Sequence, residues 1–406
     1  MKEYSHREIC EMLIGSAFLA GGGGGSLKAG MKLFDNLRDE TLKMYELEDL
    51  VDTPETKAEY AAILSALGNP SIIDDSNFAT MLRSAIHQMR KRCTACTPYK
   101  EITHIIPRGL GGMRTAIPIY ISILDKEFYL ADADGSGRSV PALETTLVSL
   151  NEAAITPYVM SNENSDCMCI DLSNDKDALK CEEVSKSLTQ TPLFDKVAGV
   201  ACYPIKSSDL ATIANPRSLS YAQRLGSLIS KYSEEKTDDA NSCVFDYLNE
   251  NMDHFTSIVL GRNSKEWTTT LSKAGKRQLS NGSTFGFIEI ASKGDGQINR
   301  WEVHFLDESI IVYQNSSTTL NAPVLTAPDI ICIFDETDNI PLSNQYILDN
   351  LDTLLNHKVS LGVFSAPQSW WEKYNAKEMT AIWRKYYDEL DYHGNCLPFA
   401  NVMNRL

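Results

Sequence analysis

Two aspartates and an arginine lie close together in the segment Asp132-Ala-Asp134-Gly-Ser-Gly-Arg138. Alternate carboxylates of this kind can orient a water molecule, act as a general base or bind a hard divalent cation. The segment begins like a calcium-binding loop, but the later ligands of such a loop are missing. Ordinary turn chemistry is the alternative, because Asp and Gly are common in turns. We expect a catalytic role for Asp132 and Asp134, with a divalent metal on them as one option and the cofactor otherwise undetermined.

Two glycine-rich segments could present backbone N–H groups to an anionic ligand. Gly21–Gly25 opens a helix, whose N-terminus attracts negative charge, although a tight helix–helix crossing would also need small residues. The second segment, 108–114, carries an arginine at each end, and guanidinium groups grip carboxylates well. The alternative for those arginines is simple exposure to solvent. The predicted substrate-binding residues are Gly22, Gly23, Gly24, Gly25, Arg108, Gly111, Gly112, Arg114 and Arg138.

A strand–helix–strand unit should position the second and third segments. Ile102–Ile106 and Phe128–Ala131 have the composition of short buried strands, and Thr115–Leu124 between them fits a helix. Strands connected in this way are parallel. The loops that follow them would then leave the carboxyl ends of neighbouring strands, where open α/β sheets bind their ligands. We therefore expect the glycine run and both of these loops to converge on one pocket.

The remaining pattern indicates two domains. Residues 55–95 are predicted to be helical, with an interruption at Asn69-Pro70, and short strands dominate from about 254 to 365. The change of character places a boundary between about 155 and 180. The predicted fold is an α/β N-terminal domain over 1–170, with a partly parallel sheet, followed by a β-rich C-terminal domain over 171–406 that has a helical lead-in.

Composition narrows the class of protein. The formal net charge of −16 opposes binding to nucleic acid, and no apolar run is long enough to cross a membrane. The ten cysteines are scattered, which favours a reducing compartment, and we expect the cytoplasm. Cys93 and Cys96 are interpreted as incidental, metal-free thiols. The aromatic residues near the C-terminus, between Trp370 and Tyr387, would serve packing or a homo-oligomer contact.

Several segments occur in a recognisable order. The most specific is Asp132-Ala-Asp-Gly-Ser-Gly-Arg-Ser-Val-Pro-Ala-Leu-Glu-Thr-Thr146, with one further segment before it and three after it along the chain. Together they resemble the S-methyl-thiohydantoin desulfurase-like family, which implies chemistry on hydantoin-like five-membered rings. The other segments are Ala17-Phe-Leu-Ala followed by the five glycines, Ala201-Cys-Tyr-Pro204 with Leu219–Leu228, Gly286-Phe-Ile-Glu-Ile290 and Ala327-Pro-Asp-Ile-Ile-Cys-Ile-Phe-Asp335.

The chain departs from the family pattern at two places. Ser26-Leu27 stands where Asp-Pro commonly follows the glycine run, and Gly109 and Arg114 stand where the second loop commonly carries Glu and Asn. The missing Glu leaves a place for another acid, and Glu144 is the candidate. The alternatives to catalysis are therefore a binding protein that has lost the chemistry, or a subunit of a larger hydantoinase-like assembly.

The resemblance leads to a hydrolase as the first hypothesis, with a small molecule as the substrate. Water would attack the ring carbon that bears sulfur, and a thiol would leave. Asp132 or Asp134 would activate the water or hold a metal, and the glycine N–H groups would stabilise the ring anion. Arg114 or Arg138 would bind a substrate carboxylate.

Overall fold

The computed structural model describes residues 1–50, 59–68, 75–95, 101–235, 243–261, 268–278, 284–294, 297–315, 322–355 and 357–404. Its chain forms two compact units. The first comprises 1–13 and 27–221, and the second comprises 14–26 and 222–406. Cys96 and the Asn69-Pro70 interruption lie outside the described residues.

A mixed β-sheet forms the centre of the first unit. Its eight described strands are ordered β1-β2-β5-β4-β3-β9-β7-β8. The pairs β2–β5, β5–β4 and β4–β3 are parallel, and the other neighbouring pairs of this sheet are antiparallel. The partly parallel sheet predicted from the sequence is thereby confirmed. The strands are β1 (Lys2–Tyr4), β2 (Leu42–Tyr45), β3 (Glu59–Gly68), β4 (Glu101–Ile106), β5 (Tyr129–Ala131), β7 (Tyr158–Ser161), β8 (Cys167–Ile170) and β9 (Val197–Lys206), with β6 (Ala133–Asp134) and β10 (Asn215–Pro216) forming a separate small pair.

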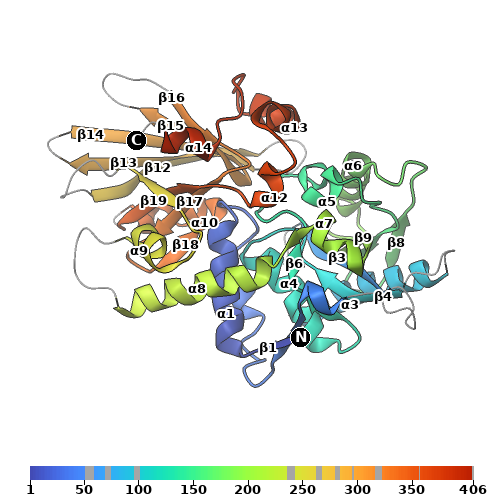
Figure 1. The fold of residues 1–406 in the computed structure, drawn as a ribbon. Helices are drawn as coiled ribbons and strands as arrows, with labels where there is room; N and C mark the ends of the chain where they lie inside the picture. Colours follow the sequence, from blue (N-terminus) through green and yellow to red (C-terminus); the bar gives the residue numbers. More distant parts are fainter. Residues whose placement is uncertain are drawn as a thin grey trace. The chain divides into compact units, whose positions relative to one another are not determined.

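Helices cover both faces of this sheet (Figure 1). A Cβ atom on Gly199 of β9 would lie 2.7 Å from the backbone oxygen of Met81, so this face packs tightly against α3. Successive side chains of a strand point to opposite faces. Val200 accordingly belongs to the core cluster that contains Cys181 of α6 on the other face. The helices are α2 (Leu27–Lys32), α3 (Asp75–Thr94), α4 (Gly112–Leu124), α5 (Leu147–Leu150), α6 (Ala178–Thr189) and α7 (Leu210–Ile213).

The helical prediction for 55–95 was half wrong. Among its described residues, 59–68 form strand β3 and 75–94 are helical. Ala61 and Leu64 have the three-residue spacing of a helix face, yet β3 lies between β4 and β9 in the sheet and its residues 61–65 are buried in succession. A central strand covered on both faces carries a continuous apolar run, so alternation is lost and periodicity misleads.

The predicted strand–helix–strand unit is confirmed as β4–α4–β5. Strands β4 and β5 are parallel, with His104 opposite Tyr129 and Ile105 opposite Leu130. Helix α4 begins directly at Gly112, so the second glycine segment leads into the N-terminus of the helix. The loop 107–111 and the segment 132–138 therefore leave the same edge of the sheet.

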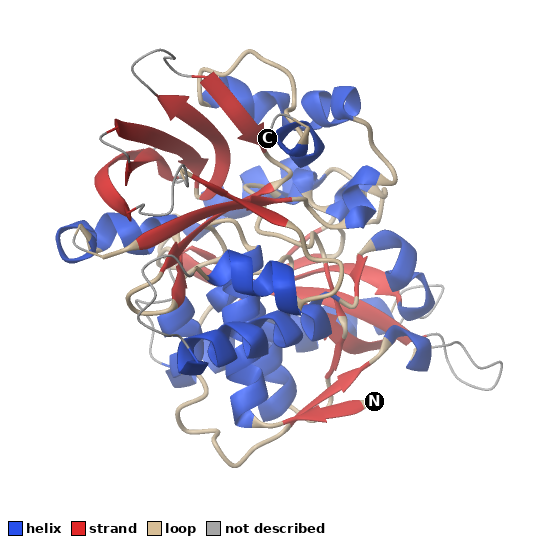
Figure 2. Cartoon of the chain, turned by 60° about the vertical axis from the view of Figure 1, so that its left-hand side comes forward, coloured by secondary structure: helices blue, strands red, loops and turns tan. Residues whose placement is uncertain are grey.

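The second unit contains the β-rich part of the chain, as predicted (Figure 2). Its described strands form a four-stranded sheet, β11-β19-β17-β18, and a five-stranded sheet, β12 to β16, and all neighbours are antiparallel. Side chains from both sheets share one apolar cluster. The strands are β11 (Ser257–Leu260), β12 (Thr268–Gln278), β13 (Thr284–Gly294), β14 (Gln297–Leu306), β15 (Glu308–Asn315), β16 (Ala322–Thr326), β17 (Ile330–Asp335), β18 (Ile340–Leu342) and β19 (Val359–Phe364).

Two helices of this unit, α1 and α8, cross at close distance. A Cβ atom on Gly15 would lie only 1.8 Å from the carbonyl oxygen of Ala222, so the crossing requires glycine there. Trp370 and Trp383 pack with Tyr386 in the interior of the unit. The helices are α1 (His6–Leu19), α8 (Ser218–Glu235), α9 (Val244–Asn251), α10 (Asn344–Asp349), α11 (Leu351–Leu354), α12 (Gln368–Trp371), α13 (Ala376–Glu389) and α14 (Phe399–Met403), with α1 and α8 beginning in the first unit.

The compact units divide the chain differently from the predicted ranges 1–170 and 171–406. The first unit extends to Tyr221, and residues 14–26 belong to the second. The physical reason is that β9 (197–206) pairs with β3 over eight register positions and so completes the first sheet.

Candidate functional site

The loops after β4 and β5 meet, as predicted. Gly135 donates its N–H to the carbonyl oxygen of Pro107 at 3.0 Å, and Leu110 donates to Arg138 at 3.3 Å. The hydroxyl of Ser136 donates to the carbonyl oxygen of Arg108 at 3.0 Å. A Cβ on Gly135 would lie 2.4 Å from that same oxygen, so glycine permits the close approach of the two backbones.

Asp134 is fully buried at this junction. One carboxylate oxygen accepts N–H groups from Ser136 at 2.9 Å and Gly137 at 2.6 Å, and the other accepts the side-chain amide of Asn215 at 3.0 Å. Burial raises the pKa of this carboxyl above its usual value, against the effect of these hydrogen bonds. The carboxylate holds the Gly-Ser-Gly turn closed and ties it to β10. Its predicted catalytic role stays a prediction, but its contacts are those of a positioning group.

Asp132 has a similar structural contact. One of its carboxylate oxygens accepts N–H groups from Leu219 and Ser220, each at 3.0 Å, in the first turn of α8. An acceptor at that place satisfies N–H groups that lack partners within the helix. Burial raises the pKa of Asp132 as well, against the lowering effect of those hydrogen bonds.

The predicted divalent metal does not suit the surroundings of Asp134. Both carboxylate oxygens of Asp134 accept N–H groups, and the positive ends of these N–H dipoles would repel a cation. Hard cations instead need several oxygen ligands arranged around one point. The surroundings of Asp134 therefore do not fit a metal, and we derive no step through one.

The three predicted arginines differ in their access to solvent. Arg138 is fully buried and donates from Nε to the carbonyl oxygen of Ser139 at 2.9 Å. Arg108 and Arg114 are half-buried. Arg114 donates to the hydroxyl of Ser139 at 2.5 Å, and Arg108 donates to the carbonyl oxygen of Val140 at 3.3 Å. Both half-buried guanidinium groups therefore border the segment that follows Arg138.

Glu144 lies further along that segment, in the short 3-10 helix η3 (Leu143–Thr145). Of the three predicted carboxylates, it is the one that is partly exposed, whereas Asp132 and Asp134 are buried. Access to solvent is a requirement for a group that must activate water. Glu144 meets that requirement without any rearrangement of the fold.

Gly111 and Gly112 have packing contacts of their own. The N–H of Gly111 donates to the hydroxyl of Thr115 at 3.2 Å, which closes the first turn of α4. A Cβ on Gly30 of α2 would lie 2.4 Å from the carbonyl oxygen of Gly112, so α2 and α4 touch through their backbones. The next N–H groups of α4 have no acceptor within the helix itself, as at any helix N-terminus.

The glycine run belongs to the second unit. Gly21 accepts the N–H of Ser309 and Gly22 accepts the N–H of Asn344, both at 2.8 Å. Gly21, Gly22, Gly24 and Gly25 have positive φ angles between 65° and 84°, which only glycine adopts at low cost. The run is thus shaped by its contacts within the β-rich unit. The predicted convergence with the loops of the first unit stays a prediction.

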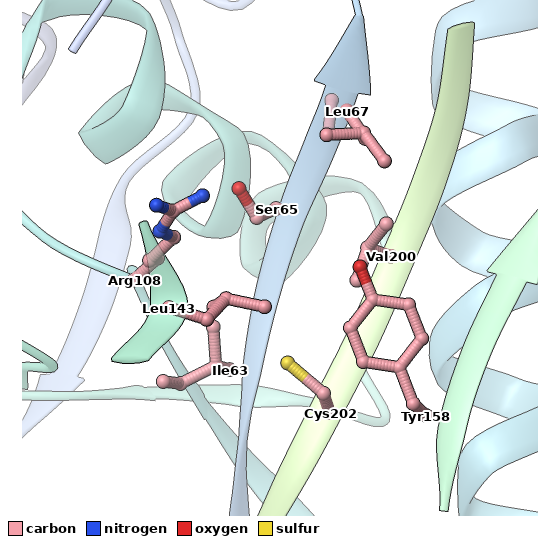
Figure 3. Close-up of a pocket in the computed structure, with 9 residues that line it drawn as sticks. Ile63, Ser65, Leu67, Arg108, Leu143, Tyr158, Val200 and Cys202 are labelled. Atoms are coloured by element: carbon pink, nitrogen blue, oxygen red, sulfur yellow. The ribbon is translucent and has the colours of Figure 1, made fainter. Parts of the chain in front are cut away.

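A narrow hollow opens beside the Arg108 loop, on the α6 face of the sheet (Figure 3). It has room for about one water molecule. Tyr158, Val200 and Cys202 are buried in its wall, and Arg108 is half-buried. Sequence reasoning found Arg108 but missed the others, because strands far apart along the chain bring them together. The lining residues are Ile63, Ser65, Ala66, Leu67, Arg108, Leu143, Tyr158, Val200 and Cys202.

Glu182, a buried glutamate of α6, contacts Leu143 in the wall of this hollow. Glu182 accepts the N–H of Leu143 at 2.5 Å and pairs with the ammonium group of Lys186 at 3.0 Å. Burial alone would raise its pKa, but the positive charges of Arg108 and Lys186 outweigh burial and hold the pKa below its usual value. Glu182 is therefore an anion in the fold, and it offsets the charge of Arg108.

Other titratable groups of the first unit behave as structural residues. His104 is buried in β4, and burial lowers its pKa to about 4, so it is neutral. His87, Asp125 and Glu127 could gather around a metal ion, but Arg83 and Arg90 already pair with the two carboxylates. Cys93 is buried and is not part of a disulfide within the described residues.

Comparison with known protein families gives two matches that together span most of the chain. Residues 7–172 match the model described as S-Me-THD-like, N-terminal domain, and 176–373 match S-Me-THD-like, C-terminal domain. The chain belongs to the S-methyl-thiohydantoin desulfurase-like family. The S-Me-THD-like domains meet between 172 and 176, whereas the compact units divide near 221. The N-terminal family domain contains the whole junction of the β4 and β5 loops.

Among solved structures, a protein from Chromobacterium violaceum shares the fold of this S-Me-THD-like chain. That crystal structure came from the Northeast Structural Genomics Consortium. The two share 19% sequence identity with a TM-score of 0.74, and the match covers 98% of this chain and 100% of the other. No curated protein matches the chain. Within the described ranges, the helices are all too short or too polar to cross a membrane.

Proposed function

We propose that the protein is a hydrolase of hydantoin-like rings that carry an alkylthio substituent. The observation that supports it most is the meeting of the β4 and β5 loops at one sheet edge, with two half-buried arginines, in an S-Me-THD-like chain. Ligands of open α/β sheets bind at such edges. The substrate would be a small neutral ring or one with a carboxylate.

The reaction consumes one water molecule. The water oxygen bonds to the ring carbon that bears sulfur, and the carbon–sulfur bond then breaks. One hydrogen of the water ends on the ring nitrogen and the other on the departing thiol, so the products are a hydantoin and a thiol. In this proposal Glu144 takes the first proton, Arg114 binds the ring oxygen or a carboxylate, and Asp132 and Asp134 position the loops.

The test is thiol release from an S-methyl-thiohydantoin by the full-length protein, with the hydantoin identified by mass spectrometry. Glu144→Gln should lower kcat about a hundred- to ten-thousand-fold, as expected when a general base is lost. Glu152→Gln is the matched control, because Glu152 is an exposed glutamate shortly after η3. Equal activity of wild type and Glu144→Gln would remove Glu144 from the mechanism.

A binding protein without catalysis is the second candidate. It is favoured by the structural contacts of Asp132 and Asp134, which leave Glu144 as the partly exposed acid among the three predicted. Ring compounds that raise the thermal stability of the protein without ever releasing a thiol would support this candidate. Co-purification with a large partner would point instead to a subunit of an assembly.

A further inference from the structure

The hollow beside Arg108 lies at the same sheet edge as the proposed site. Ser65 and Leu67 line it from the last residues of β3, and β3 is parallel to β4. Arg108 follows β4 by two residues and lies on the same side of β3 as the hydroxyl of Ser65 (Figure 3). Leu67 and Arg108 are half-buried at the mouth, whereas Ile63 and Cys202 are buried at depth. The hollow therefore opens toward the loops.

Its wall suits a small neutral group. Ile63, Leu143 and Val200 are apolar, and burial raises the pKa of the Cys202 thiol far above its usual value, so the thiol stays neutral. The Tyr158 hydroxyl donates to Ser185 of α6 at 3.2 Å, so its hydrogen already has an acceptor. Away from Ser65 and Arg108 the wall is therefore mostly apolar, and apolar cavities favour apolar ligands.

The charge at the mouth is compensated. Buried Glu182 lies close enough to Arg108 for the guanidinium to stabilise its charge. A guanidinium balanced by a buried anion binds a second full carboxylate less well than an isolated one. It can still stabilise a partial negative charge that appears only during a reaction.

We propose that this hollow receives the terminal methyl group of a methylthio substituent on the ring, with Arg108 facing the sulfur atom at the mouth. The inference rests on the proposed function and specifies where its leaving group lies. As the carbon–sulfur bond breaks, the electron pair of that bond goes to sulfur, which takes up a proton as it leaves. Arg108 stabilises the partial negative charge that builds up on sulfur in this step. Glu182 then acts as a positioning residue that fixes Arg108.

The small size of the hollow sets the substrate preference. The enzyme should accept a ring with an S-methyl substituent and discriminate against one with an S-propyl substituent. Each additional methylene that an apolar pocket cannot hold lowers kcat/KM about tenfold or more. Val200→Ala removes two methyl groups from the wall and should raise the S-propyl to S-methyl ratio of kcat/KM at least about tenfold. Val159→Ala is the matched control, because Val159 is next to Tyr158 in β7 and points to the opposite face of the sheet.

A second variant keeps the inference testable if Val200→Ala does not fold. Leu67→Ala widens the half-exposed mouth and should move the same ratio in the same direction. A ratio that is unchanged in both variants, or that moves equally in Val159→Ala, overturns the inference even when thiol is released. If no S-alkyl ring releases a thiol, the proposed reaction fails. The inference is then decided by calorimetry, from the ratio of the dissociation constants of the S-propyl and S-methyl rings in the wild type and the same variants. If neither ring binds, the inference is overturned as well.

Discussion

Asp134 offers the sharpest test of how the site loops are held. Its carboxylate accepts hydrogen bonds from three buried donors, the N–H groups of Ser136 and Gly137 and the amide of Asn215. Each buried donor left without an acceptor costs about 1–3 kcal/mol. Allowing for partial relaxation, we expect Asp134→Ala to lower the free energy of unfolding by about 3–5 kcal/mol, which is a large part of the stability of a typical domain.

The conservative variant should behave differently. In Asp134→Asn the remaining carbonyl oxygen can still accept the two backbone N–H groups, and Asn215 can rotate its amide to accept from the new one. We therefore expect a loss of only about 1–2 kcal/mol. Urea unfolding, followed by circular dichroism, measures both variants. Exposed Asp209→Ala is the control and should lie within about 0.5 kcal/mol of wild type.

Two results would refute this reasoning. A loss below about 1 kcal/mol in Asp134→Ala would show that its hydrogen bonds are not structural. If Asp134→Asn instead kept full stability but lost all turnover, Asp134 would be a catalytic group, as the sequence alone had suggested. Stability and activity that fall together would support the positioning role.

Three further outcomes follow from the packing and the charges. Gly135→Ala should destabilise the protein by about 1–3 kcal/mol in urea, since its Cβ would lie 2.4 Å from a backbone oxygen; an unchanged midpoint would contradict the close approach. Glu182 has a pKa below its usual 4.5, so its contribution to stability is present above that pH and lost as the pH falls through the lower, folded value. Glu182→Gln should therefore weaken the acid dependence of the urea midpoint, while neighbouring, exposed Glu183→Gln should not. Asp335, 2.7 Å from the ring of His357, raises the pKa of that histidine above 6.5. The ion pair therefore stabilises the fold fully below pH 6.5, and this contribution is lost as the pH rises through the raised pKa of His357. The urea midpoint of the wild type should fall over that pH range, and His357→Gln should remove this fall.

Local pattern alone determined the unit that carries the site. The buried strands around Ile102–Ile106 and Phe128–Ala131, joined by one helix, were recognisable because short apolar runs followed by glycine-containing loops are informative without long-range contacts. The topology of such a unit then requires parallel strands and loops at one edge. The block from Asp132 to Thr146 carried the resemblance to the family, and the family match over 7–172 confirms that family.

Tertiary structure decided what the residues of that edge do. Asp132 and Asp134 look like free carboxylates in the sequence, but their partners Leu219 and Asn215 are more than eighty residues away along the chain. Strand β3 was read as helix because both its faces are covered, which removes alternation. The hollow needed side chains from three strands, one loop and the 3-10 helix η3, and such a cluster has no local signature. Sequence determines local elements through short-range preferences, whereas the role of a polar side chain depends on which distant donors the fold brings within 3 Å of it.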